Sequence, residues 1–115
     1  MIHKAWQHDP TVITPQQALQ AATIAGAKAQ GREHCGLIKE NYKADVIVLD
    51  ISAPYMQPIH HLMHNLIYSS CGTDVKLTMV DGKILYQDGV YKTIDLEKVI
   101  YEANCSKERI LHELQ

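Results

Sequence analysis

The segment His60-His61-Leu62-Met63-His64 holds the side chains best suited to binding a metal ion. A helix would bring His60 and His64, four positions apart, to one face. The zinc-protease motif with this spacing has glutamate in its second place, where this chain has His61, and Pro58 leaves the start of a helix undefined. Because a metal site needs three or four donors, we expect a polar loop or a helix start with adventitious nickel or zinc binding. An independent metal-binding domain at the three histidines is kept as a reserve hypothesis.

Two aspartates, Asp45 and Asp50, could be considered as a carboxylate pair for acid–base catalysis. Asp45 and Asp50 flank the apolar run Val46–Leu49, while Asp81 and Asp88 each precede a glycine. A catalytic pair of carboxylates would need to face the same substrate. Aspartate is also common in turns and at strand ends, and we interpret all four residues in this way.

Cys71 is the candidate nucleophile, because it lies among the small residues Ser69, Ser70 and Gly72. A thiol needs a neighbouring base to become a nucleophile, and the sequence places none beside it. No glycine-rich loop precedes the first long predicted helix, so a phosphate-binding loop is not expected there. The sequence therefore assigns no catalytic, cofactor-binding or metal-binding residue to this chain.

Length and composition fit one small domain over residues 1–115. The net charge of −2 gives no reason to expect nucleic acid or an anionic membrane as a partner. No run approaches about 18 apolar residues, and the N-terminus lacks the apolar segment of a signal peptide. The three cysteines, at 35, 71 and 105, match no zinc or redox spacing. We expect reduced thiols in a cytoplasmic protein.

The elements start with a predicted helix, after an irregular segment over residues 1–13. Thr14 can cap this helix, Pro15 suits its first position, and Gln17 completes a capping box. Helix-forming residues continue to about Gln30, and Gly31 is the expected stop. Small side chains recur on one face and would let the helix pack closely: Ala18, Ala22, Ala25 and Ala29.

The middle of the chain combines a strand with irregular structure. The run Val46–Leu49 is typical of a strand buried on both faces, and Asn41 can adopt the left-handed conformation of a preceding turn. Prolines interrupt residues 52–74. Within them His61 to Tyr68 could form a short helix or a covering loop, and Ser69 to Asp74 should form a turn.

A β-hairpin and a helix are predicted to follow. Asp81-Gly82 supplies two positive φ angles between strands over residues 75–80 and 83–86, with one face buried. Asp88-Gly89 should end the return strand. Asp95 then caps an amphipathic helix, whose apolar stripe is Leu96, Val99, Ile100, Ala103, Ile110, Leu111 and Leu114.

Four segments, in this order, resemble the C-terminal region of the amidohydrolase superfamily. The similarity is greatest to its adenosine-type deaminases and chlorohydrolases, including S-adenosylhomocysteine and methylthioadenosine deaminases. Asn41 stands where that family usually has glycine, and Tyr42 where it often has lysine. The similar segments are Ala22–Ala29, Gly36–Asp50, Leu66–Tyr68 with Gly72–Val75, and Met79–Lys83 with Asp88-Gly89.

The resemblance implies an α+β fragment of such an enzyme. The last helix of the catalytic barrel would lie at about 14–31, part of a composite β-sandwich at about 36–94, and a C-terminal helix at about 95–114. The metal ligands of these enzymes, a His-x-His among them, would lie elsewhere in the parent. The resemblance implies zinc or iron for the parent and no cofactor for this chain.

Two functional hypotheses follow. In the first, the chain is the non-catalytic C-terminal portion of an amidohydrolase that deaminates or dechlorinates a purine-like or other heterocyclic substrate with metal-activated water. Its partner would then be the remainder of the barrel. In the second, the chain is a stand-alone interaction module that forms homo-oligomers through exposed apolar surface and strand edges.

Overall fold

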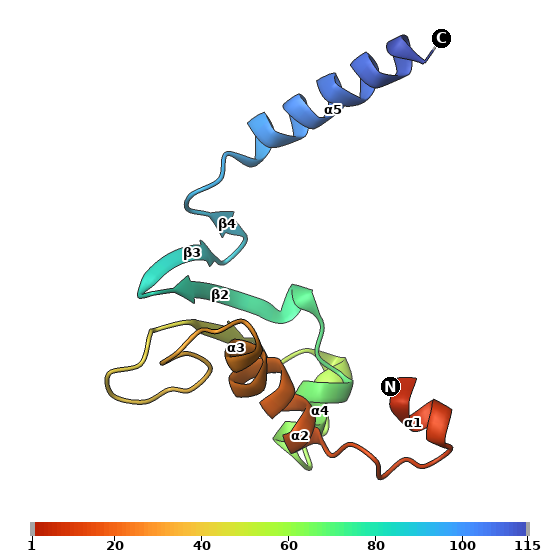
Figure 1. The fold of residues 1–115 in the computed structure, drawn as a ribbon, viewed down its shortest axis with the longest axis vertical. Helices are drawn as coiled ribbons and strands as arrows, with labels where there is room; N and C mark the ends of the chain where they lie inside the picture. Colours follow the sequence, from red (N-terminus) through yellow and green to blue (C-terminus); the bar gives the residue numbers. More distant parts are fainter. Residues whose placement is uncertain (1, 115) are drawn as a thin grey trace.

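The computed structural model describes residues 2–114; Met1 and Gln115, the two ends of the predicted domain, lie outside them. The fold is α+β, with four short strands and a C-terminal helix (Figure 1). The elements are α1 (Ile2–Gln7), α2 (Pro15–Gln20), a π-helical turn (Ala21–Ala25), α3 (Gly26–Ala29), β1 (Val46–Leu49), a 3₁₀ turn (Pro54–Met56), α4 (Leu62–Tyr68), a second 3₁₀ turn (Gly72–Asp74), β2 (Val75–Val80), β3 (Lys83–Gln87), β4 (Val90–Tyr91) and α5 (Leu96–Glu113).

The N-terminal segment is more regular than its sequence predicts. The expectation of irregular structure over residues 1–13 is wrong for α1. Lys4 Nζ donates a hydrogen bond of 2.6 Å to the Tyr68 hydroxyl and lies 5.1 Å from the centre of that ring. A helix this short is unstable alone, so its contact with α4 supplies what local propensity cannot.

The helix after Thr14 begins and ends as predicted. The Thr14 side chain accepts a hydrogen bond from Gln17 N at 3.2 Å, and the Gln17 side chain accepts one from Thr14 N at 2.9 Å. Gly31, with φ +68°, follows the last turn. The π-helical turn was not predicted. Within it, Thr23 Oγ1 donates to the carbonyl of Leu19 at 2.8 Å, a side-chain bond that competes with the regular helical ladder.

The loop after α3 passes directly over this π-helical turn. Gly36 has φ +82°, and a Cβ on it would lie 2.8 Å from the carbonyl carbon and oxygen of Thr23. Only glycine fits both the angle and the approach. Asn41, with φ +63°, adopts the left-handed conformation expected of it.

One antiparallel sheet contains all four strands, in the order β1-β2-β3-β4. The hairpin is confirmed, because Asp81 and Gly82 have φ +50° and +77°, as a type I′ turn requires. Asp88 and Gly89, with φ +47° and +86°, form the next turn and lead into β4.

β1 is an edge strand with both faces exposed, which corrects the prediction that it is buried on both faces. It pairs with β2, with Val46 opposite Met79. The side chains of Ile47 and Val48 are 58% and 49% exposed. The apolar run is real, but within residues 2–114 it has a neighbour on only one edge. The predicted buried face of β2 is also only partly covered, since Leu77 and Met79 are half-buried.

The segment between β1 and β2 contains a helix where the sequence allowed either a short helix or a covering loop. α4 begins after His61, and the predicted turn over residues 69–74 includes a 3₁₀ turn. Among the described residues no helix is long and apolar enough to cross a membrane.

The chain is extended for its length. Its radius of gyration is 18.9 Å, whereas a compact domain of 100 residues has about 13 Å. Its accessible surface is 9385 Å², against roughly 6,300 Å² for a compact protein of this mass. Cys35 and Met56 are the buried hydrophobic residues within the described part of the chain. α5 begins at the predicted cap, with Asp95 accepting from Lys98 N at 3.0 Å, and points away from the sheet (Figure 1).

Replacing Gly36 by alanine should destabilise the chain more than replacing Gly89. Both positions have positive φ, but a Cβ at Gly89 meets nothing within 4 Å. Gly89→Ala should therefore cost only the strain of a left-handed residue, about 1–2 kcal/mol. Gly36→Ala should cost at least about 1 kcal/mol more, because the helix backbone must move. Urea unfolding followed by circular dichroism measures both, and equal losses would contradict the close approach.

Candidate functional site

The three candidate histidines do not form a common metal-binding face. His60 precedes α4, and His61 is the extended residue before its first turn. His64 is inside the helix, with its ring centre 5.3 Å from that of His61. The described part of the chain contains no cluster of three or more His, Cys, Asp or Glu that could hold a metal ion. These donors do not fit the catalytic metal of an amidohydrolase.

Asp45 joins three separate segments of the chain. One carboxylate oxygen accepts from Asp81 N at 2.8 Å, in the hairpin turn, and the other accepts from Arg32 Nη2 at 2.8 Å, in the loop after α3. These contacts, the Asp81 N–H first, hold the pKa of the Asp45 carboxyl below its ordinary value. Both oxygens are already occupied, so this carboxylate positions structure.

Asp50, at the other end of β1, also stabilises a turn. Its side chain accepts from Ser52 N at 2.9 Å, and Lys76 Nζ lies 3.6 Å from the same carboxylate. The hydrogen bonds from Ser52 lower the pKa of Asp50. Asp50 N donates to the carbonyl of Asp74 at 2.8 Å, which ties the end of β1 to the start of β2.

Asp74 is the centre of a polar cluster that sequence reasoning missed. Its side chain is buried, at 5% exposure, and accepts hydrogen bonds from the Tyr55 hydroxyl and, at 2.8 Å, from Cys71 N. These bonds, that of Tyr55 first, lower the pKa of Asp74. Cys71 and Asp74 have the spacing of a capping box. This spacing was the one feature of the sequence that could have indicated the contact between them.

Cys71, the candidate nucleophile, lies at the edge of this cluster. Its sulfur is 2.9 Å from Thr73 Oγ1 and 3.5 Å from the Tyr55 hydroxyl. The hydrogen bond with Thr73, followed by that with Tyr55, lowers the pKa of the thiol. The Thr73 hydroxyl can donate to a thiolate, whereas the Tyr55 hydroxyl already donates its one hydrogen to Asp74, and neither hydroxyl is a base that would take the thiol proton.

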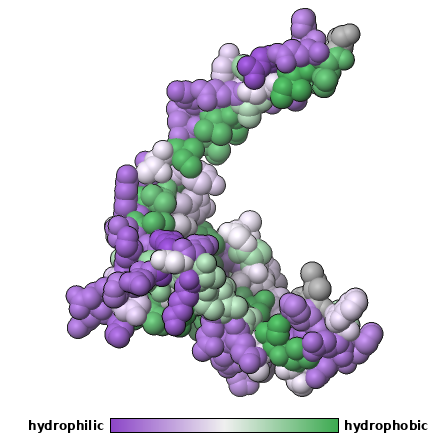
Figure 2. All heavy atoms as spheres, viewed as in Figure 1, coloured by the Kyte–Doolittle hydropathy of each residue, from purple (hydrophilic) through white to green (hydrophobic). Residues whose placement is uncertain are grey.

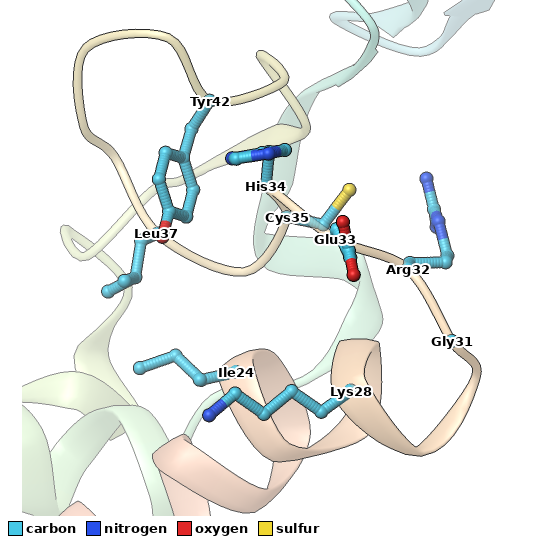
Figure 3. Close-up of a pocket in the computed structure, with 9 residues that line it drawn as sticks. All are labelled: Ile24, Lys28, Gly31, Arg32, Glu33, His34, Cys35, Leu37 and Tyr42. Atoms are coloured by element: carbon cyan, nitrogen blue, oxygen red, sulfur yellow. The ribbon is translucent and has the colours of Figure 1, made fainter.

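A cavity of about 430 Å³ lies between α3 and the loop that follows it (Figure 3). Tyr42 packs edge-on against His34, with ring centres 5.4 Å apart. Figure 3 shows Leu37, Ile24 and Lys28 around the hollow, whereas Arg32 points away from it. The walls are mainly apolar, and although His34 and Cys35 both line the cavity, no hydrogen bond joins their side chains within residues 2–114. Its full lining is Ile24, Lys28, Gly31, Arg32, Glu33, His34, Cys35, Leu37 and Tyr42.

Comparison with known proteins identifies the class of protein. The model of the amidohydrolase family matches residues 1–85, which is most of the chain. The chain belongs to the amidohydrolase family. It is 42% identical over 102 residues to the 5-methylthioadenosine/S-adenosylhomocysteine deaminase of Dictyoglomus thermophilum. It is 41% identical over 111 residues to the 5'-deoxyadenosine deaminase of Methanosarcina mazei.

Solved structures agree with this assignment. A zinc-bound adenosine deaminase from Xanthomonas campestris superposes on 95% of this chain with a TM-score of 0.89 and 30% identity. The match covers only 25% of that protein. The two deaminase sequences likewise match 89% and 96% of this chain, but 24% and 26% of their own length. The chain thus spans about a quarter of the relatives it resembles.

Asp74→Asn should make the chain less stable at neutral pH and less sensitive to acid. Because the folded-state pKa is lowered, the ionised carboxylate contributes stability that is complete above the ordinary value of 3.8 and is lost as pH falls toward the folded-state value. The unmodified chain should therefore lose more stability than Asp74→Asn between pH 6 and about pH 3. Melting temperatures across this range measure the difference, and parallel pH profiles would contradict it.

Proposed function

We propose that this chain is the C-terminal, non-catalytic portion of a metal-dependent amidohydrolase. The observation that carries the proposal is the coverage of the matches. Similarity to the two deaminases extends over most of this chain but over only about a quarter of the length of each deaminase. The donors in the described residues do not converge on a metal, so we assign no catalytic, cofactor-binding or metal-binding residue here.

The proposed parts keep the boundaries expected from the sequence. Residues at about 14–31, from Thr14 through α2 and α3, would be the last barrel helix. Residues at about 36–94 would contribute the four-stranded sheet to a composite β-sandwich, and residues at about 95–114 would form the C-terminal helix. The exposed residues Ile47 and Val48 of β1 point to opposite faces of the strand, and they support this arrangement because a second layer of strands would cover one of these faces.

The proposed parent is a hydrolytic deaminase of purine-like substrates, with dechlorination of a heterocycle as the related chemistry. Support comes from the sequence similarity to the 5-methylthioadenosine/S-adenosylhomocysteine deaminase and the 5'-deoxyadenosine deaminase. The metal, zinc or iron, would supply an activated water molecule. Every ligand would come from the remainder of the parent, and this chain's contribution would be to support the barrel. The free thiols support a reducing compartment such as the cytoplasm.

The purified chain should therefore release no ammonia from adenosine, 5'-methylthioadenosine or S-adenosylhomocysteine when zinc, manganese or iron is added. A metal-activated water needs three or four converging ligands, which this chain does not bring together. An enzyme-coupled ammonia assay measures the outcome, with a full-length relative as the positive control. Turnover that a chelator abolishes would refute the proposal.

A second candidate function is a self-associating interaction module. The edge strand β1 and the large exposed surface favour it, because both promote association. No nucleic-acid or membrane partner is proposed.

Light scattering of the isolated chain separates the two candidates. A stand-alone module should give a discrete oligomer whose mass does not change on dilution through the micromolar range. The separated portion of a larger enzyme should give a broad, concentration-dependent distribution, because its exposed surface has no specific match in a second copy. A discrete dimer or tetramer would favour the module.

A further inference from the structure

The apolar face of α5 has no cover within the described chain. Its apolar side chains lie along one side of the helix, with an interruption at Lys107, and they are the green parts of the projecting helix in Figure 2. The stripe occupies one side of an 18-residue helix. Its large members are about half exposed or more: Leu96, Val99, Ile100, Ile110, Leu111 and Leu114. We infer that this face docks against the remainder of the amidohydrolase polypeptide, an inference that rests on the proposed function.

The helix has two chemically different sides, so a docked side and a solvent side can be assigned. Successive residues are about 100° apart around a helix of 3.6 residues per turn. Ile100 and Ile110 then lie within the stripe, while Cys105 lies at the middle of the opposite side. Lys98 and Arg109 lie beside Cys105 on that opposite side. The docked side is apolar and the other side is charged, as in a helix that covers a larger body.

A second copy of α5 is a poor occupant of this stripe. Lys107 lies on the same side as the apolar residues, between Ala103 and Ile110. A parallel pair of helices would set Lys107 against the same lysine of the other copy, which is unfavourable. An antiparallel pair centred on Cys105 would set it against Ala103, which is small. Either pairing leaves the middle of the contact with little apolar area.

The remainder of the parent is the better occupant. The solved deaminase superposes on 95% of this chain, so most of α5 has the same placement in a protein about four times as long. The match to the deaminase of Methanosarcina mazei covers 96% of the chain and also includes α5. The chain exposes about 3,000 Å² more than a compact protein of its mass. Contacts between permanently associated bodies bury about 2,000–5,000 Å² summed over both bodies, or roughly 1,000–2,500 Å² on each, so the excess is large enough for such a contact.

The test places this chain in a complete enzyme. The segment of the Methanosarcina mazei deaminase that matches this chain is replaced by residues 1–115, and the melting temperature is measured for two variants. Ile100→Asp should lower it by more than about 5 °C, because a carboxylate would be buried without a partner. The matched control, Cys105→Asp, puts the same side chain on the solvent side and should change it by less than about 1 °C.

Two further measurements test the inference even if the Ile100→Asp variant does not fold. The first uses alanine variants: Ile100→Ala should lower the melting temperature more than Cys105→Ala does, with both shifts smaller than those of the aspartate variants. In the hybrid enzyme, Cys105 should react with a maleimide at the rate of an exposed thiol. A cysteine introduced at Ile110 in a Cys105→Ser background should react at least about tenfold more slowly.

Equal melting shifts for the two sides, equal thiol rates, or an insoluble hybrid would overturn the inference. So would a hybrid whose Ile100→Asp variant changes only its oligomeric mass, since that outcome assigns the stripe to a second copy. None of these readouts uses catalysis by the isolated chain. Failure of the docking inference is therefore distinguishable from failure of the proposed function.

Discussion

Apolar side chains must be covered, and a sheet that carries them on both faces needs another layer on each face. This chain has one four-stranded sheet with β1 at its edge, and its last helix extends into solvent (Figure 1). Hydrophobic burial is the main favourable term in folding, so a surface this open leaves much of the apolar area of the chain without stabilising cover. The amidohydrolase assignment and the partial coverage of its relatives are consistent with that requirement.

Within the chain, polar contacts hold together segments that the small hydrophobic core does not connect. Asp45 joins the loop after α3 to the hairpin turn, and Asp74 joins Tyr55 to the start of β2. Both connections lie at the ends of strands and join segments that are distant in the sequence. They fix the relative positions of segments and leave the outer faces free, which suits a unit that is completed by a second body.

Local signals predicted the elements better than their surroundings. The capping box at Thr14 and the Asp81-Gly82 turn each depend on residues within a few positions of one another, and both were predictable from the sequence. The helix α1 depends on Lys4 meeting Tyr68, 64 positions away, so no local pattern could reveal it. The exposure of Ile47 was also unpredictable, because an apolar strand looks the same whether or not its covering layer belongs to the same chain. The cluster around Asp74 required the approach of Tyr55 from another turn.

The central claim is that the donors within residues 2–114 do not converge on a catalytic metal. Elemental analysis after zinc saturation and gel filtration tests it most directly. The account predicts far less than one retained zinc ion per chain, with any residual binding lost when His64 is replaced by alanine. One tightly held ion per chain that survives competition with a chelator would contradict it.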